Sequence, residues 1–468
     1  MRALWFASWI VQTINYHTSV KYNGVLMNWK KLLSTNRTGQ ATRVQHHDRT
    51  QFQRDYDRLI FSSPFRRMQD KTQVFPLPGS VFVHNRLTHS LEVASVGRSL
   101  GSNIARFLNE GYGEELPLAD ELGSVVAAAC LAHDMGNPPF GHSGEKAISD
   151  YFRYGKGQYL KDMVDSPEIW NDFIDFEGNA NALRVLTHKF KGRRSGGFAL
   201  TYTTVASIVK YPYASGRNDL KKYGFFQSEK EMFLNIASEL GLKEVRAGVF
   251  ARHPLVYLVE AADDICYQIM DIEDAHKLGI LSTEETRGLL MAFYDPVEDK
   301  SHLKRIKEVS KEVTDTNEQI AYLRAGVIGK LVDACTRIFR EHHDEILNGT
   351  FTGALTEHLG SPVYDAMKEC SKVGFEKIYK HPSVVEIEIA GFKILGTLLD
   401  EFIHAVLNPQ HYYSGLLLPF IPEQYRVPDS APVHHRIQTV IDFISGMTDV
   451  YALDLFRKIR GTRLGGKN

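Results

Sequence analysis

The feature that most constrains this chain is the spacing of its apolar residues, which recur at alternating steps of three and four over most of its length. Such spacing puts apolar side chains on one face of a helix, whereas strands need two-residue alternation, which is rare here. We expect helices over residues 91–109, 119–133, 255–275 and 318–347, and only the patch at 384–389 is rich in β-branched residues. The sequence predicts a mainly α-helical protein.

The composition is that of an ordinary globular chain, with 43% hydrophobic residues and 55 Lys and Arg against 56 Asp and Glu. A net charge near zero provides no overall field that would select a nucleic acid or a membrane, although a few basic residues in one pocket suffice for a phosphate group. The opening MRALWFASWIVQTINYH is apolar but carries an early Arg and several polar residues, so we expect no signal peptide. Four cysteines without C-x-x-C spacing predict neither a thiolate zinc site nor a disulfide framework, and favour the reducing cytoplasm.

The chain is expected to have three parts. Residues 1–26 form an extension ahead of Met27, residues 27–300 a catalytic core, and residues 301–468 a helical region that completes this core. Residues 211–227 are rich in Tyr, Gly, Lys and Asn, and are predicted to form an irregular segment between helices. Loops of this length often carry function.

A first polar segment, residues 84–90, precedes the helix predicted at 91–109. Thr88 is a candidate cap for that helix, because a Thr hydroxyl can accept a free N–H group of the first turn. Arg86 and His89 are three residues apart, so on a helical turn they point the same way. The segment therefore offers a cation and an imidazole side by side.

A second polar segment lies at the end of the next predicted helix. Gly136 and Pro138 stop that helix and leave His133 and Asp134 at its C-terminal end. Neighbouring residues diverge within a regular helix, but where the chain turns both side chains can reach one ion. The sequence predicts a pair of vicinal ligands at this turn.

The helix predicted at 255–275 has an apolar stripe and a second, acidic face. The acidic face aligns Glu260, Asp263, Tyr267, Asp271 and Asp274 at steps of three and four. Aligned carboxylates repel one another unless they meet water, cations or donors, so a solvated face and a cation site both stay open. Imidazoles and carboxylates together suit Mn²⁺, Fe²⁺, Zn²⁺ or Mg²⁺. The apolar stripe consists of Leu255, Leu258, Ala262, Ile265, Ile269 and Ile272.

Six segments resemble the deoxyguanosine triphosphate triphosphohydrolases of the HD superfamily. They are KTQVFPLPG (71–79), NRLTHSLEV (85–93), AHDMGNPPFGHSGEKAI (132–148), FEGNANALRVL (176–186), EAADDICYQIMDIEDA (260–275) and DFISGMTDVYALDL (442–455). The resemblance covers most of the chain from about residue 30 and leaves out the first part. It implies a mainly α fold, with an HD-domain helical phosphohydrolase core and a helical C-terminal region.

The resemblance also implies the metal site. Its ligands would be His89, His133, Asp134 and Asp263. Of the adjacent pair Asp263 and Asp264, Asp263 is assigned because Tyr267 and Asp271 follow it at i+4 and i+8, as in the family. The ion is expected to be Mn²⁺ or Mg²⁺, with Fe²⁺, Zn²⁺, Co²⁺ or Ni²⁺ as alternatives.

The remaining site residues are assigned by the same resemblance. His142 and Glu145 correspond to the acid–base pair, although an ordinary surface pair at i,i+3 is an alternative. Tyr267 and Asp271 would contact the sugar, leaving little room for a 2′-hydroxyl, unless Tyr267 is a half-buried helix residue. Gln73 would read the base. The phosphate contacts would be Arg86, Lys210, Tyr211 and Lys222, unless these are solvated.

The implied activity is metal-dependent hydrolysis of dGTP, or of other dNTPs, to a deoxynucleoside and tripolyphosphate by attack of water at the α-phosphorus. Two alternatives stay open. One is another HD phosphohydrolase that acts on nucleoside monophosphates or cyclic dinucleotides, and the other is a nucleotide-sensing or single-stranded DNA-binding protein with a vestigial site. The resemblance also implies a homo-oligomer built from dimers, up to a hexamer, with its interface in residues 301–468. No membrane partner is expected, and binding of single-stranded DNA as a second property stays open.

Overall fold

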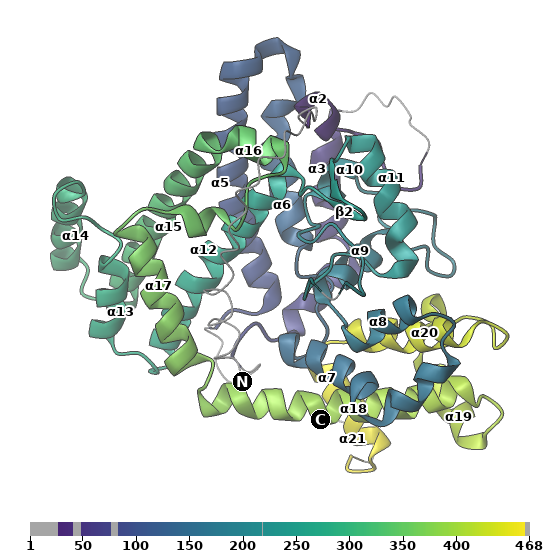
Figure 1. Cartoon of the computed structure of the whole chain (residues 1–468). Coiled ribbons are helices and arrows are strands. Elements are labelled where there is room, and N and C mark those ends of the chain that lie inside the picture. Colours follow the sequence, from purple (N-terminus) through teal and green to yellow (C-terminus); the bar gives the residue numbers. More distant parts are fainter. Residues whose placement is uncertain (1–26, 41–47, 76–82, 218, 464–468) are drawn as a thin grey trace.

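Figure 1 shows the computed structural model of the chain, in which residues 27–40, 48–75, 83–217 and 219–463 are described. This part is mainly helical, as the apolar spacing predicts, and none of its helices is long and apolar enough to cross a membrane. The predicted extension, residues 1–26, lies outside it. The strands β1 (Glu244–Arg246) and β2 (Val249–Phe250) pair antiparallel. The helices are α2 (Trp29–Leu32), α3 (Gln51–Ile60), α4 (Ser63–Arg67), α5 (Arg86–Tyr112), α6 (Leu122–Ala132), α7 (Gly141–Arg153), α8 (Pro167–Ile174), α9 (Gly178–Thr187), α10 (Tyr202–Ala206), α11 (Lys230–Leu240), α12 (Pro254–Lys277), α13 (Thr283–Met291), α14 (Lys300–Glu312), α15 (Thr316–Glu341), α16 (His343–Asn348), α17 (Val363–Val373), α18 (Pro382–Leu407), α19 (Tyr412–Leu417), α20 (Val433–Ser445) and α21 (Asp449–Ile459).

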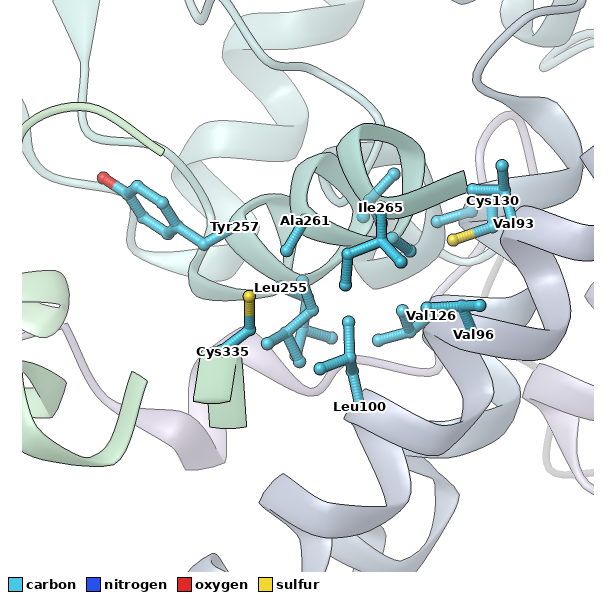
Figure 2. Packing of buried hydrophobic residues seen from close by; sticks show 14 of the residues in the cluster. Val93, Val96, Leu100, Val126, Cys130, Leu255, Tyr257, Ala261, Ile265 and Cys335 are labelled. Carbon is cyan, nitrogen blue, oxygen red and sulfur yellow. The ribbon is translucent and has the colours of Figure 1, made fainter. Parts of the chain in front are cut away.

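A first hydrophobic cluster joins α5, α6 and α12. Figure 2 shows Leu100 of α5 close to Val126 of α6, with Ile265 of α12 beside them, and all three are fully buried. A Cβ at Gly101 would lie 2.7 Å from the carbonyl oxygen of Leu122, so glycine allows α5 and α6 to approach this closely. Tight packing fixes the three helices that carry the predicted metal ligands.

A second hydrophobic cluster joins α7 and α8 to helices from the end of the chain, α18, α20 and α21. Ile148 and Phe152 of α7 are buried in it together with Leu395 and Phe402 of α18, the long helix along the bottom of Figure 1. Helices beyond residue 301 therefore share a core with the segment that contains His142. The boundary at residue 300 and the oligomer interface stay predictions.

The cap of α5 differs from what the sequence predicts, and the β-branched patch at 384–389 is helical. Asn85, rather than Thr88, is the N-cap residue of α5: its side chain accepts the N–H of Thr88, and the Thr88 hydroxyl accepts the N–H of Asn85. Asn is at least as good a cap as Thr, and this reciprocal pair satisfies two donors at once. Residues 384–389 lie inside α18, with Val384 buried, because tertiary packing outweighs weak β-propensity. The described residues between 211 and 226 are irregular, as predicted.

Candidate active site

Four side chains converge where α5, α6 and α12 meet. Ligand atoms of His89, His133 and Asp134 all lie within 4.8 Å of one another. Asp263 Oδ1 is 3.0 Å from His89 Nε2 and 3.5 Å from His133 Nε2, and His133 Nε2 is 3.7 Å from Asp134 Oδ1. Three of the predicted ligands thus form one group that could hold an ion, and Asp263 lies against the two histidines of this group.

The donor atoms of this cluster fit a divalent cation. His133 Nδ1 donates to the carbonyl oxygen of Cys130 at 2.6 Å, which turns Nε2 toward the cluster, and among the described residues buried Nε2 has no hydrogen-bond partner. Burial lowers the pKa of His133, but the Asp134 and Asp263 carboxylates outweigh it and raise the pKa to about 9. The field that favours a proton on this ring would equally favour a metal ion. Two imidazole nitrogens and two carboxylates suit a borderline-to-hard ion.

The turn after α6 sets the orientation of two of these side chains. His133 is the C-cap residue of α6, as predicted, and Asp134 follows it. A Cβ at Gly136 would lie 2.1 Å from a backbone nitrogen of α9, so glycine is needed for α9 to pack against the turn. Asn137 Nδ2 donates to Asp134 Oδ1, and Arg86 Nη1 to Asp134 Oδ2, both at 2.6 Å. Arg86 therefore lies in the site, paired with a candidate ligand.

His142 and Glu145 lie in the first turns of α7. His142 Nδ1 is 2.8 Å from Glu145 Oε2, while Glu145 Oε1 accepts the N–H of Gly178 at 2.9 Å. The His142 side chain is 66% exposed and that of Glu145 only 12%. Burial works to raise the pKa of Glu145, but His142, Lys222 and the Gly178 amide outweigh it and lower the pKa. The buried Glu145 carboxylate thus holds Nδ1 of His142, while most of the His142 side chain stays exposed.

Two lysines, Lys210 directly before the irregular segment and Lys222 within it, lie around one tyrosine. The Nζ atoms of Lys210 and Lys222 are 5.8 Å and 5.9 Å from the centroid of the Tyr211 ring. Lys210 Nζ is also 2.8 Å from Glu260 Oε1, and Lys222 Nζ is 3.8 Å from Glu177 Oε1. The sequence reasoning missed Glu177 as a site residue and placed Glu260 only in an acidic row, because both pairs join distant segments.

The acidic face of α12 is not a solvated surface. Glu260, Asp271 and Asp274 are 8%, 6% and 2% exposed. Burial of carboxylates is tolerated only where cations or donors compensate. Each of these carboxylates has such a partner. Glu260 pairs with Lys210 and Arg252, Asp271 accepts a hydrogen bond from Tyr379, and Asp274 is paired with His84.

Tyr379 completes the end of the site where the sugar contacts were predicted, and sequence reasoning missed it. Its hydroxyl donates to Asp271 Oδ2 at 2.7 Å, and its ring stacks on Tyr267 at 5.9 Å between centroids. It follows a π-helical turn at Gly374–Ile378, a type of turn often found at functional sites. Burial raises the pKa of Asp271 to about 8. Tyr379 has no motif around it that would single it out.

One cavity of ≈ 330 Å³ connects these groups. Gln73 lies on its wall, and the buried Gln73 Oε1 has no hydrogen-bond partner among the described residues. His89 and Asp271 are not among the described lining residues, but they bond to Asp263 and Tyr379, which are. The other predicted residues on the wall are Arg86, His133, Asp134, His142, Glu145, Lys210, Tyr211, Lys222 and Tyr267.

Comparison with known proteins places this site in a family. Residues 86–194 match the HD domain, and residues 358–458 match the phosphohydrolase-associated domain. A deoxyguanosinetriphosphate triphosphohydrolase-like protein of Synechocystis sp. is 38% identical over 455 residues, which cover 94% of this chain and 100% of that protein. A deoxyguanosinetriphosphate triphosphohydrolase of Yersinia enterocolitica is 32% identical over 484 residues, 87% of this chain and 93% of that protein. The chain belongs to the deoxyguanosinetriphosphate triphosphohydrolase family of HD-domain proteins.

The resemblance seen in the sequence motifs is thereby confirmed, and the chain is a hydrolase. The HD match begins with α5 and extends past α9, so it contains His89, His133, Asp134 and the acid–base candidates on α7. An HD domain implies a divalent metal ion, in agreement with the His–His–Asp cluster. The phosphohydrolase-associated match spans α17 to α21 and so includes α18, the helix that packs against α7.

Proposed function

We propose that the protein hydrolyses deoxynucleoside triphosphates, with dGTP as the first candidate, to a deoxynucleoside and tripolyphosphate. Family membership and the names of the relatives support a dNTP substrate. The observation that carries the proposal is that one cavity combines a cation site, a His–Glu pair, two lysines around a tyrosine, and a pair of stacked tyrosines, of which Tyr379 donates to Asp271. These groups match the α-phosphate, the leaving oxygen, the phosphate tail and the sugar of a dNTP.

The phosphate end of the mechanism depends on charge neutralisation. A divalent ion held by His89, His133, Asp134 and Asp263 would polarise an α-phosphate oxygen and supply an activated water. Lys210 and Lys222 lie on the same cavity wall, where they would bind the β- and γ-phosphates. Their buried partners keep both ammonium groups in place before substrate arrives. Alignment and neutralisation account for most of the acceleration in phosphoryl transfer.

The leaving group explains the need for an acid. Attack of water at the α-phosphorus expels the nucleoside 5′-oxygen, a basic alkoxide that departs more readily when it is protonated. His142 would give that proton from Nε2, since its Nδ1 is held by Glu145. Glu145 has a positioning role, because its own contacts are to His142 and to the amide of Gly178.

The sugar end would select deoxynucleotides. Asp271 would accept a hydrogen bond from the 3′-hydroxyl, and the stacked rings of Tyr267 and Tyr379 would pack against C2′. A 2′-hydroxyl would meet aromatic carbon and lose its hydration there. Gln73, whose carbonyl oxygen has no hydrogen-bond partner within the described part of the chain, would meet the base.

The test is product identification. The metal-loaded protein is incubated with each of the four dNTPs, with GTP, and with a nucleoside monophosphate and a cyclic dinucleotide, and products are separated by anion-exchange chromatography. We expect tripolyphosphate and deoxynucleoside from a dNTP, and none from an Asp263→Ala control. Release of pyrophosphate, or turnover of only the monophosphate or the cyclic dinucleotide, would refute the proposal.

A further inference from the structure

One residue of the C-terminal motif has no role in the mechanism above, yet it touches two segments of the site. Asp449 lies in the first turn of α21 and is 6% exposed. Its Oδ2 accepts the backbone N–H of Thr72 at 2.8 Å, and its Oδ1 accepts the backbone N–H of Phe140 at 3.0 Å. A single buried carboxylate therefore binds two chain segments that are far apart in the sequence.

The Thr72 segment carries the candidate base contact. Thr72 directly precedes Gln73, whose side chain lies on the cavity wall. The same segment runs against the start of α5: Thr72 forms a bridge with Asn85, and the N–H of Arg86 donates to the carbonyl oxygen of Lys71 at 3.2 Å. A shift of this segment would move Gln73 relative to the cation site.

The Phe140 segment carries the candidate acid. Phe140 is the N-cap residue of α7, two residues before His142, and it has a φ of 63°. Residues other than glycine adopt this left-handed conformation only where their surroundings impose it. The Phe140 side chain cannot cap the helix, but the N–H of Phe140 donates to Asp449, and this bond ties the start of α7 to α21.

Lys71 ties the same three segments together a second time. Its Nζ donates to the carbonyl oxygens of Asn137 at 2.6 Å and Ser445 at 3.0 Å, and the residue is 3% exposed. These two bonds keep the segments close, but they lie farther along the chain from Gln73 and from α7 than the bonds of Asp449. Asp449 binds the residue directly before Gln73 and the N-cap residue of α7.

We propose that Asp449 is a positioning residue for dNTP hydrolysis, which holds Gln73 and His142 in one fixed relation through the N–H groups of Thr72 and Phe140. The inference rests on the proposed function. Base reading and proton transfer each depend on a short bond, and a misplacement of about 1 Å can lower a rate by a factor on the order of 100. Helix α21 then contributes to the chemistry, although none of its described residues lines the cavity.

The experiment compares Asp449→Ala and Asp449→Asn with Asp442→Asn. Asp442 is a matched control, since it is a carboxylate of the same motif, 7% exposed, bound to Arg184 instead of to the site segments. Per folded, metal-loaded molecule, Asp449→Ala should lower kcat by a factor on the order of 10 to 100 and reduce the preference among the four dNTPs. Asp449→Asn keeps one acceptor oxygen, so its decrease in kcat and in base preference should be smaller than that of Asp449→Ala. Asp442→Asn should lower Tm and leave the base preference as it is.

A second readout is independent of turnover. Hydrogen exchange of peptides that cover residues 71–73 and 139–143, in the full chain without substrate, should accelerate in Asp449→Ala and stay unchanged in Asp442→Asn. If exchange accelerates while the wild-type protein hydrolyses no dNTP, the proposed function is wrong but the positioning contact stands. Unchanged exchange, or an Asp449→Ala protein with normal kcat and base preference, overturns the inference.

Discussion

His253 at the start of α12 predicts a defined acid sensitivity. The side chain is 1% exposed and serves as the N-cap: Nδ1 accepts the N–H of Leu255 at 3.2 Å, while Nε2–H donates to the carbonyl oxygen of Leu32 at 3.1 Å. Both bonds require the neutral ring, since a proton on Nδ1 removes the acceptor. Burial lowers the pKa of His253 from 6.5 to about 4.

The sign and size of the effect follow from proton linkage. Between pH 6.5 and about 4 the unfolded chain binds the proton and the folded chain does not, so the stabilisation is complete above pH 6.5 and is lost as the pH falls. A pH of about 5 lies about 1.5 units below the unfolded-state pKa of 6.5. The free energy of unfolding should therefore be about 2 kcal/mol lower there than above pH 6.5. Because α12 carries Asp263, Tyr267 and Asp271, fraying of its cap would also disturb the site.

The assay is urea unfolding of the chelator-treated wild type and His253→Asn at about pH 7.5 and about pH 5. Asn can cap the helix but does not titrate, so the stability difference between the two proteins should shrink by about 2 kcal/mol at the lower pH. His411→Asn is the control, because His411 is the exposed N-cap residue of α19 and makes no cap bond with its side chain. A stability difference for His253→Asn that is equal at both pH values would refute the reasoning.

Three further predictions concern the site. Asp263→Ala should abolish metal binding by elemental analysis, whereas Asp264→Ala should retain the metal, because Asp264 Oδ2 bonds to Thr356; the opposite result would mean that the register is wrong. GTP should have a far lower kcat/KM than dGTP, and Tyr379→Ala should reduce the difference in kcat/KM between the two nucleotides. Equal kcat/KM values for GTP and dGTP in the wild type would contradict the sugar assignment. In ¹⁸O-water the label should enter tripolyphosphate, and His142→Gln should lower kcat by roughly 10² to 10⁴ with normal metal content. Label in the nucleoside, or unchanged turnover, would contradict that mechanism.

The helices that carry the site could be predicted because their signal is local. The apolar spacing indicates a helix over 91–109, and the structure has α5 over Arg86–Tyr112; it indicates 119–133, and α6 spans Leu122–Ala132. Gly136 and Pro138 mark the end of α6, so the position of His133 at its cap follows from residues within one turn. Such features depend on near neighbours, which a single sequence displays.

The partners of the site residues could not be predicted, because they come from distant parts of the chain. Tyr379 is 108 residues from the carboxylate it binds, and Phe140 is 309 residues from Asp449. The spacing of the acidic residues along α12 is compatible both with a solvent-exposed face and with a cation site. Burial decides between the two, and burial depends on the tertiary fold.

The two hydrophobic clusters must keep one relative position for the proposed chemistry, because the cation site lies on the first and His142 on the second. Apolar packing is non-directional, so it holds the clusters together without fixing their register. α9 bridges them, with Leu183 in the first cluster and Ala180 in the second. Asp449 of α21 adds directional bonds: it accepts the N–H of Thr72, whose segment contributes Phe75 to the first cluster, and the N–H of Phe140, which packs against the second cluster. The phosphohydrolase-associated region, which contains Asp449, therefore helps to set the register between the candidate acid–base pair and the cation site.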